Sequence, residues 1–167
     1  RYIEGVTNNV RVASVYVPNG QSVGSEKYDY KMTFLTNLRE HLNSLLQYEE
    51  ACVVGGDYNI APTDQDVHDP IKWSGRILCS DRERAEFRSL LHLGYTDALR
   101  IFHDKAGPFS WWDYRSGSWE RQEGLRIDHL LLSPQAVDCV ENAGVDPAPR
   151  GKEKASDHAP VWCDLKR

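Results

Sequence analysis

Residues 51–59 read Ala51-Cys52-Val53-Val54-Gly55-Gly56-Asp57-Tyr58-Asn59, a short apolar run that ends in two glycines and an acid. Such a run, bounded by turn-forming residues, predicts a buried central strand that opens into a loop. Ligands of α/β sheets bind just beyond such strand ends. There, the carboxylate of Asp57 can hold a metal or orient water, and the carboxamide of Asn59 can donate to a phosphoryl oxygen. A tight turn is the alternative interpretation, because Gly, Asp and Asn are common in turns.

On both sides of this run, strand patterns alternate with helix patterns. Alternation predicts a strand over 10–17, and apolar residues at three- and four-residue steps predict an amphipathic helix over 26–47. Ser80 and Glu83 form a capping box that begins a helix ending at Gly94. Further strands are expected over 109–114, 125–132, 140–145 and 160–165, with a short helix at Ser133-Pro134 and a loop over 57–80. No repeat or linker interrupts the pattern, which predicts a layered α/β or mixed fold.

Composition indicates one ordinary globular domain, residues 1–167. The chain has 40% hydrophobic and 27% charged residues, which excludes disordered and collagen-like classes. Its net charge of -5 excludes bulk electrostatic attraction to nucleic acid, so a polyanionic partner requires a locally basic surface or bound metal ions. The four cysteines form no CxxC pair and are expected to be free thiols in a reducing compartment. We expect neither a membrane span nor a signal peptide. Because Arg1 replaces an initiator Met, we expect a fragment or a processed product.

Asp128 lies within the apolar run over 125–132. With a period of two it shares its face with Leu130 and Leu132, so its carboxylate is expected to be partly buried and to need a partner. A histidine or a metal would serve. An ion pair with Arg126, two positions away on the same face, is an equal alternative.

Ser156-Asp157-His158-Ala159-Pro160 precedes the last predicted strand. His158 can bond or protonate a phosphate oxygen, and Asp157 can reach a cation; a solvated loop is the alternative. Three acid-bearing sites, each at a strand end or inside an apolar strand, with Asn59 and His158 as further polar groups, suit metal-assisted phosphodiester hydrolysis.

The aromatic segment contains two adjacent tryptophans, Trp111 and Trp112, which must point to opposite faces of a strand. At most one is therefore core. The other either packs under a loop or offers a stacking surface for a base or sugar. Arg115, Arg121 and Arg126 would then contact phosphates.

A second acidic segment contains Asp64, Asp66, His68 and Asp69. It has metal-ligating residue types, but Pro62 and Pro70 bracket a stretch that has no apolar wall to exclude water. We interpret it as a solvated loop.

Taken together, these motifs resemble the C-terminal part of the exonuclease III family, the abasic-site DNA endonucleases of the endonuclease/exonuclease/phosphatase superfamily. The resemblance covers nearly the whole chain. Five motifs carry it in family order: Tyr16-Val17-Pro18-Asn19-Gly20, Gly56-Asp57-Tyr58-Asn59-Ile60-Ala61-Pro62, Phe109-Ser110-Trp111-Trp112-Asp113-Tyr114-Arg115, Gly124-Leu125-Arg126-Ile127-Asp128 and Ser156-Asp157-His158-Ala159-Pro160. The last motif indicates only the superfamily, while the aromatic and Gly-Leu-Arg-Ile-Asp motifs favour the exonuclease III branch.

The resemblance implies a fold and a role for each matching residue. The fold is a four-layered αββα sandwich of the DNase I-like type, here lacking an N-terminal portion that would carry an Asn and a Glu metal ligand. The implied catalytic residues are Tyr16, Asp57, Asn59, Asp128 and His158. Asp57, Asn59 and Asp157 would hold Mg²⁺, or Mn²⁺ as an alternative. The implied DNA contacts and abasic-sugar pocket are Trp111, Arg115, Leu125 and Ile127.

The implied partner is duplex DNA with abasic sites or 3′ ends. Incision on the 5′ side of the abasic site would be accompanied by 3′–5′ exonuclease and 3′-phosphatase activity. The protein would be a monomer without membrane contact, in the bacterial cytosol or nucleoid. Two alternatives remain: a catalytically silent fragment that only binds DNA or a partner, and a phosphomonoesterase of the same superfamily.

Overall fold

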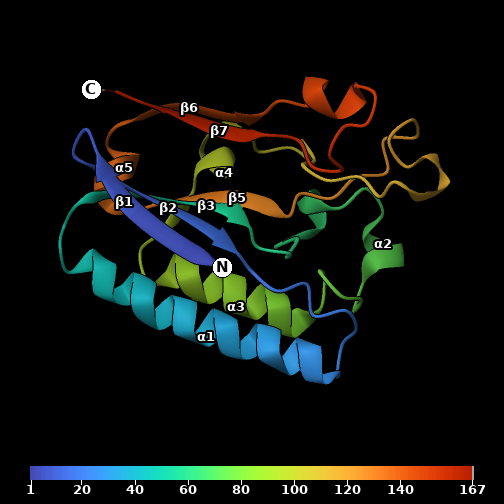
Figure 1. Ribbon diagram of the computed structural model, residues 1–167, viewed down its shortest axis with the longest axis horizontal. Coiled ribbons are helices and arrows are strands. Elements are labelled where there is room, and N and C mark those ends of the chain that lie inside the picture. Colours follow the sequence, from blue (N-terminus) through green and yellow to red (C-terminus); the bar gives the residue numbers. More distant parts are fainter. Residues whose placement is uncertain (167) are drawn as a thin grey trace.

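A computed structural model describes residues 1–166 and confirms a mixed α/β architecture (Figure 1). It contains a five-stranded sheet of order β1-β2-β3-β5-β4 and a two-stranded sheet of β6 and β7. The strands are β1 (Tyr2–Thr7), β2 (Val10–Tyr16), β3 (Ala51–Asp57), β4 (Thr96–Asp97), β5 (Asp128–Leu132), β6 (Val140–Val145) and β7 (Val161–Leu165). The α-helices are α1 (Glu26–Leu46), α2 (Pro70–Trp73), α3 (Asp81–His92), α4 (Ala98–Phe102) and α5 (Pro134–Val137). Short 3₁₀ helices occupy Asp64–Asp66, Arg115–Gly117 and Ala148–Gly151.

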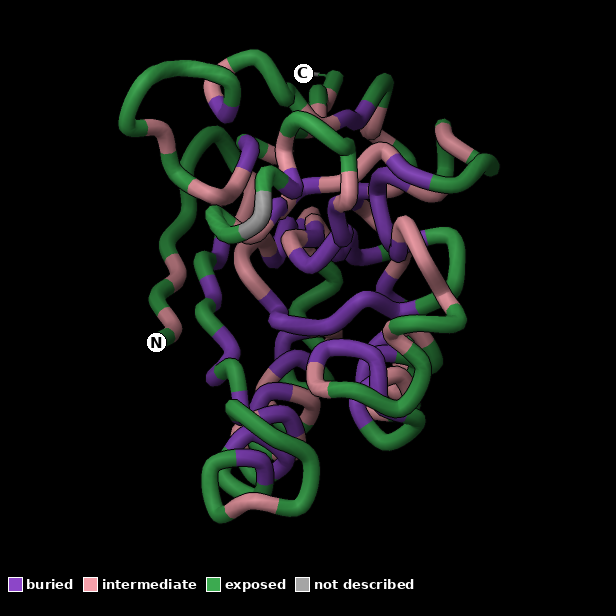
Figure 2. The backbone as a smooth tube through the Cα atoms, turned by 90° about the vertical axis from the view of Figure 1, so that its right-hand side faces the viewer, coloured by how far each residue is buried: buried purple, intermediate pink, exposed green. Residues whose placement is uncertain are grey.

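The layers follow from where each element buries its apolar side. Helices α1 and α3 cover one face of the five-stranded sheet, and β6 and β7 lie on its other side (Figure 1). The apolar stripe of α1, including Leu35 and Leu42, packs in one cluster with Val15 and Val54 of the sheet. Buried residues are concentrated in the middle of the molecule (Figure 2). The order helix, sheet, sheet gives three of the four layers expected from the sequence.

Strand direction decides which residues meet. Strand β3 pairs in parallel with β2 and antiparallel with β5. The carboxyl ends of β2 and β3 therefore lie at the same edge of the sheet, beside the start of β5. In this register, Asp57 is opposite Tyr16 on one side and Asp128 on the other.

The strand expected over 125–132 begins only at Asp128, because the residues before it bond elsewhere. Leu125 and Trp111 exchange two backbone hydrogen bonds of 2.9 Å each. The segment from 125 to 127 thus leaves the sheet and joins the aromatic segment, which forms isolated bridges instead of the strand expected over 109–114. The other predicted elements are present within a few residues, and β1, β4 and α4 are additions that no pattern indicated.

The interpretation of residues 64–69 as a solvated loop is wrong for Asp66, which has no exposed surface. Its carboxylate accepts from Arg126 Nε at 2.7 Å and pairs with Arg100, while Arg126 also holds both oxygens of Asp97 at 3.0 and 2.7 Å. Burial alone would raise the pKa of Asp66, but the two arginines lower it to about 2. Arg126 is only 1% exposed and its guanidinium is held by Asp66 and Asp97, so the alternative in which it pairs with Asp128 and the expected phosphate contact are both wrong.

The other acidic residues of that loop do not gather. The Asp64 side chain is 70% exposed and pairs with Arg84, and Asp69 caps α2 by accepting from Lys72 N at 3.0 Å. His68 bonds the carbonyl of Gly124 through Nδ1.

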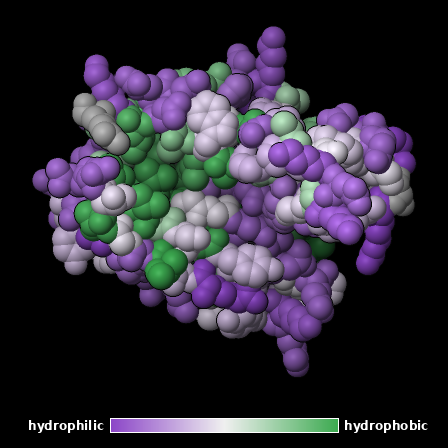
Figure 3. All heavy atoms as spheres, turned by 45° about the horizontal axis from the view of Figure 1, so that its top comes forward, coloured by the Kyte–Doolittle hydropathy of each residue, from purple (hydrophilic) through white to green (hydrophobic). Residues whose placement is uncertain are grey.

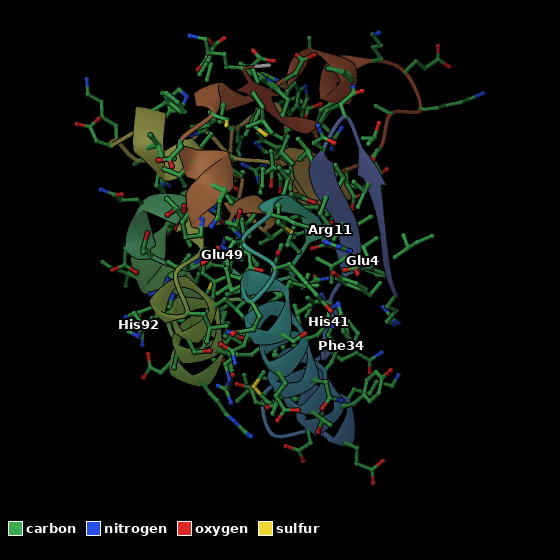
Figure 4. The ribbon with its side chains drawn as sticks, turned by 90° about the vertical axis from the view of Figure 1, so that its left-hand side faces the viewer. Glu4, Arg11, Phe34, His41, Glu49 and His92 are labelled. Carbon is green, nitrogen blue, oxygen red and sulfur yellow. The ribbon has the colours of Figure 1, made fainter. Side chains whose placement is uncertain are left out.

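An apolar surface accompanies the edge of the larger sheet. Ile3, Val6 and Val12 are 72%, 60% and 45% exposed, and Figure 3 shows apolar side chains gathered on the face turned to the viewer. At the α1 side of this edge, Glu4 accepts from Arg11 at 3.0 Å and lies 3.2 Å from His41 Nε2 (Figure 4). These charges limit edge-to-edge strand pairing. In the part of the chain described, no helix has the length and apolar character to cross a membrane.

Substituting Asp66→Asn is expected to lower the free energy of unfolding at pH 7 by about 3–5 kcal/mol, because Arg126 loses one of its two buried countercharges. The folded pKa of Asp66 is below its unfolded value, so this contribution is complete above about pH 4 and disappears as the pH falls toward 2. Urea unfolding of both proteins at pH 7 and pH 3 measures the difference. Asp64→Asn, an exposed substitution in the same loop, is the control and should change stability little. An equal effect of both substitutions would contradict the assignment.

Candidate active site

Three neighbouring strand ends bring Tyr16, Asp57 and Asp128 side by side. Tyr16 is half-exposed, whereas the two carboxylates are mostly buried. Burial, and then the negative charge of Asp128, raise the pKa of Asp57 to about 6. A carboxyl with a pKa near neutrality in a polar cluster is suited to proton transfer.

Gly56 makes this close strand alignment possible. Its φ is +149°, and a Cβ there would lie 1.9 Å from the carbonyl oxygen of Val15 on β2. No other residue fits without separating β2 from β3. The glycine therefore sets the spacing between Tyr16 and Asp57.

Asn59 is held against Asp57 by its backbone and its side chain. Its backbone N–H donates to Asp57 Oδ1 at 2.8 Å, and its Nδ2 donates to Asp57 Oδ2 at 2.9 Å and to the carbonyl of Val17 at 3.0 Å. Its Oδ1 accepts from Asn19 Nδ2 at 3.0 Å. Every polar atom of the amide has a partner, so the side chain has one defined orientation.

The partner of Asp128 is His158, so the histidine is confirmed among the partners that the sequence left open, which were a histidine, a metal and Arg126. His158 Nδ1 lies 3.0 and 2.9 Å from the two carboxylate oxygens, and Ser110 Oγ donates to Oδ2 at 2.6 Å. With Nδ1 bonded to the carboxylate, Nε2 is the ring nitrogen left to meet a substrate. Burial lowers the pKa of His158, but the hydrogen bond and charge of Asp128 outweigh it and raise that pKa above its ordinary value.

Trp111 connects the aromatic segment to the Asp-His loop. Its Nε1 donates to Asp157 Oδ2 at 2.9 Å, and its backbone bridges both Leu125 and His158. Trp112 points the other way: it is 2% exposed and packs edge-on against Trp119 with 4.8 Å between ring centroids. The expectation that at most one of the two tryptophans is core is confirmed.

A hollow of about 250 Å³ lies against Trp111 and Arg115. Leu125 and Ile127, expected to line the same pocket, have 0% and 2% exposed surface and lie in a buried cluster against which Trp111 packs. They support the pocket from beneath and do not form its open wall. The hollow is also lined by Arg121, which was expected to contact phosphate, and by residues to which sequence reasoning gave no role there: His68, Lys72, Trp73, Asp113, Ser118 and Glu123.

Sequence reasoning also gave no role to Asn19 and Ser110, although both lie within motifs that it quoted. Asn19 orients the Asn59 amide, and Ser110 Oγ accepts from the backbone N–H of Ile127 and Asp128 while donating to the Asp128 carboxylate. A polar residue inside an aromatic or apolar run is the signal that could have indicated them.

The polar side chains at the strand ends include candidate ligands for a cation. Within residues 1–166, no group of three or more His, Cys, Asp or Glu side chains is arranged to hold a metal. Burial, and then the negative charge of Asp128 on the adjacent strand, nevertheless raise the pKa of Asp57, and a bound cation would relieve the like-charge repulsion between the two carboxylates. Carboxylate oxygens are ligands that Mg²⁺ prefers, with water completing its shell. The residues therefore fit a partly hydrated divalent cation.

Comparison with known proteins identifies the family of the chain. The model of the Endonuclease/Exonuclease/phosphatase family matches residues 2–158. The chain belongs to this family. A curated family member, the exodeoxyribonuclease III of Haemophilus influenzae, is 34% identical over an alignment of 163 residues that covers 93% of the chain and 61% of that relative. The chain thus spans about three fifths of the length of this relative.

Solved structures of the family confirm the fold. One solved structure is described as a 3′ phosphatase from Neisseria bound to product DNA hairpin. It matches with a TM-score of 0.97 and 40% sequence identity, and the match covers 100% of this chain and 65% of the Neisseria chain. The structure of an AP endonuclease from Archaeoglobus fulgidus matches with a TM-score of 0.93 and 34% sequence identity, over 99% of this chain and 65% of the Archaeoglobus chain. The DNase I-like exonuclease and AP endonuclease fold expected from the sequence is confirmed.

Asp128→Asn is expected to lower the pKa of His158, because the imidazolium loses the negative charge that favours it. Titration of the imidazole followed by NMR chemical shifts measures the change. Asp138→Asn, an exposed substitution next to α5, should leave the His158 titration unchanged. A His158 pKa that is the same in both variants would show that Asp128 does not set it.

Proposed function

We propose that the chain forms the catalytic strand ends of a metal-dependent DNA-repair phosphodiesterase that cuts at abasic sites and processes 3′ ends. The observation that carries this proposal is the placement of Asp57, Asn59 and the Asp128–His158 pair on adjoining strand ends. The resemblance noted in the sequence, and the names of the relatives, support a nuclease. The activity is a proposal for the whole protein, of which the relatives suggest this chain is a part.

In this proposal Asp57 orients and deprotonates the attacking water. Its largely buried carboxylate lies opposite Asp128 and against Asn59, where an ionised oxygen can accept a proton. Asn59 stabilises charge on the phosphoryl oxygens in the transition state, for which its Nδ2 exchanges one of its two present acceptors, Asp57 Oδ2 or the carbonyl of Val17, for a phosphoryl oxygen. The half-exposed Tyr16 at the adjacent strand end donates to a phosphate oxygen.

His158 contacts the scissile phosphate through Nε2. The carboxylate of Asp128 fixes the ring and favours its protonated form, so the side chain presents positive charge to an anion. Ser110 fixes Asp128 in turn.

Asp57, Asn59 and Asp157 would hold Mg²⁺, with Mn²⁺ as the alternative. When bound, the cation supplies charge neutralisation at the phosphate and lowers the pKa of water. Trp111 holds Asp157 in place by its indole N–H. The side-chain oxygen Oδ1 of Asn59 is a weaker candidate ligand than the two carboxylates, because Asn19 Nδ2 already donates to it.

The hollow beside Trp111 and Arg115 is our candidate for the abasic sugar and its flanking phosphates. Lys72, Arg115 and Arg121 outnumber Asp113 and Glu123 among the charged lining residues, and Arg121 is paired with Glu123, so the hollow carries a small excess of positive charge. Duplex DNA with abasic sites or 3′ ends is the proposed partner. We propose a monomer that acts on DNA in the cytosol or nucleoid and contacts no membrane.

One comparison favours a second activity at the same site. The Neisseria structure is described as a 3′ phosphatase with product DNA. Removal of a 3′ phosphate is a phosphomonoesterase reaction that the same water-activating and phosphate-binding side chains can perform. We therefore include it as a companion activity of the proposed nuclease.

In the full-length protein, Asp57→Asn is expected to lower kcat on an abasic duplex by about 10²–10⁴-fold, because the general base is lost. Strand incision on a denaturing gel, with Mg²⁺ and then with EDTA, measures it. Asp64→Asn should retain wild-type rates. EDTA should stop incision and added Mg²⁺ should restore it. Incision that continues in EDTA, or in Asp57→Asn at the wild-type rate, would refute the proposal.

A further inference from the structure

Lys31 is a buried charge that the proposed mechanism does not use. It comes from the first half of α1, and its side chain has no exposed surface. Its Nζ donates to Glu83 Oε1 at 2.5 Å, to the carbonyl of Asn59 at 2.6 Å and to the carbonyl of Asn19 at 3.2 Å. All three ammonium protons therefore have an acceptor.

A lysine buried this completely is costly unless it is paired, and burial lowers the pKa of Lys31. The pairing comes from Glu83 at the start of α3, which has no exposed surface either. The carboxylate of Glu83 is itself fixed by the backbone N–H groups of Leu78 and Ser80 and by the Ser80 hydroxyl. The Lys31–Glu83 ion pair is thus fixed by the capping box of α3, which holds the Glu83 carboxylate in one orientation.

The other two acceptors of Lys31 belong to the two asparagines of the site. Asn59 has a φ of +51°, a left-handed backbone conformation that an L side chain rarely adopts and that needs outside support. The bond from Lys31 to its carbonyl fixes the orientation of that peptide. Lys31 also fixes the carbonyl of Asn19, whose side chain holds Asn59 Oδ1. One ammonium group therefore restrains the Asn59 side chain by two routes.

We propose that Lys31, locked by Glu83, is a positioning residue that holds Asn59 against Asp57. The inference rests on the proposed function for the contribution of Asn59 to catalysis, but the positioning itself is a property of the fold. Lys31 touches neither substrate nor reacting atoms in this proposal, and acts through Asn59 alone.

The test compares Lys31→Met with Leu42→Ala in the full-length protein. Both changes alter a fully buried side chain of α1, but Leu42 lies three turns from Lys31 and has no bond to either asparagine. At a temperature where circular dichroism shows both variants folded, Lys31→Met should lower kcat on an abasic duplex about 10–100-fold with KM unchanged. Leu42→Ala should retain kcat although it is destabilised. Equal kcat values for the two variants would overturn the proposal and leave Lys31 a purely structural residue.

A second measurement does not depend on activity. Hydrogen exchange followed by mass spectrometry should show faster exchange across residues 57–61 in Lys31→Met, because the Asn59 amide loses its fixed bond to Asp57, and unchanged exchange there in Leu42→Ala. If the wild type shows no nuclease activity but this contrast is present, the proposed function fails and the positioning stands. If exchange across 57–61 is the same in both variants, the positioning fails whatever the activity.

Discussion

The register of β3 between β2 and β5 is the constraint on which the site depends. Parallel pairing on one side and antiparallel pairing on the other place Asp57 opposite both Tyr16 and Asp128. Because side chains alternate along a strand, a slip of one residue would turn Asp57 to the other face of the sheet. The apolar clusters on both faces of β3 prevent such a slip, since Val54 belongs to the cluster under α1 and Val53 to the cluster under β6.

The same pairing creates an electrostatic difference between two neighbouring carboxylates. Asp128 is bonded to His158 and to the Ser110 hydroxyl, and its negative charge stabilises the protonated imidazole of His158. Asp57 has only amide donors of Asn59 and is buried beside that second negative charge, so its pKa rises to about 6. One carboxylate thereby orients an imidazole, while the other retains the basicity that proton transfer needs. The net charge of -5 does not predict this difference between the two carboxylates, because the difference comes from the groups in direct contact with each of them.

Local signals in the sequence predicted much of this structure. Apolar periodicity identified α1, the Ser80–Glu83 capping box identified α3, and the run before Gly55 identified the central strand. Partial burial of Asp128 also followed from alternation alone. These features are readable because residues that interact are neighbours in the chain or share one face of one element.

The features that sequence reasoning missed depend on contacts between distant segments. Asp66 looked solvated because its own loop has no apolar wall, yet Arg126, 60 positions later, covers it. Lys31 drew no attention within a charged helix, although it meets Glu83 52 positions later. Leu125 and Ile127 matched a pocket motif, but the packing of the 61–79 region beneath Trp111 buries them. Such pairings require the tertiary arrangement before they can be recognised.

The buried arginine has a consequence for how the molecule assembles. The guanidinium of Arg126 has its carboxylate partners on two segments, the 3₁₀ turn at Asp64–Asp66 and the Asp97 end of β4. Neither segment can enclose that charge alone, and an arginine with half its partners is less stable in an apolar interior than in water. The segments that carry Asp66, Asp97 and Arg126 should therefore pack against one another in a single folding step. Loss of any one would release the others and, with them, the strand that carries Asp128, so this half of the sheet should open and close as a single cooperative unit.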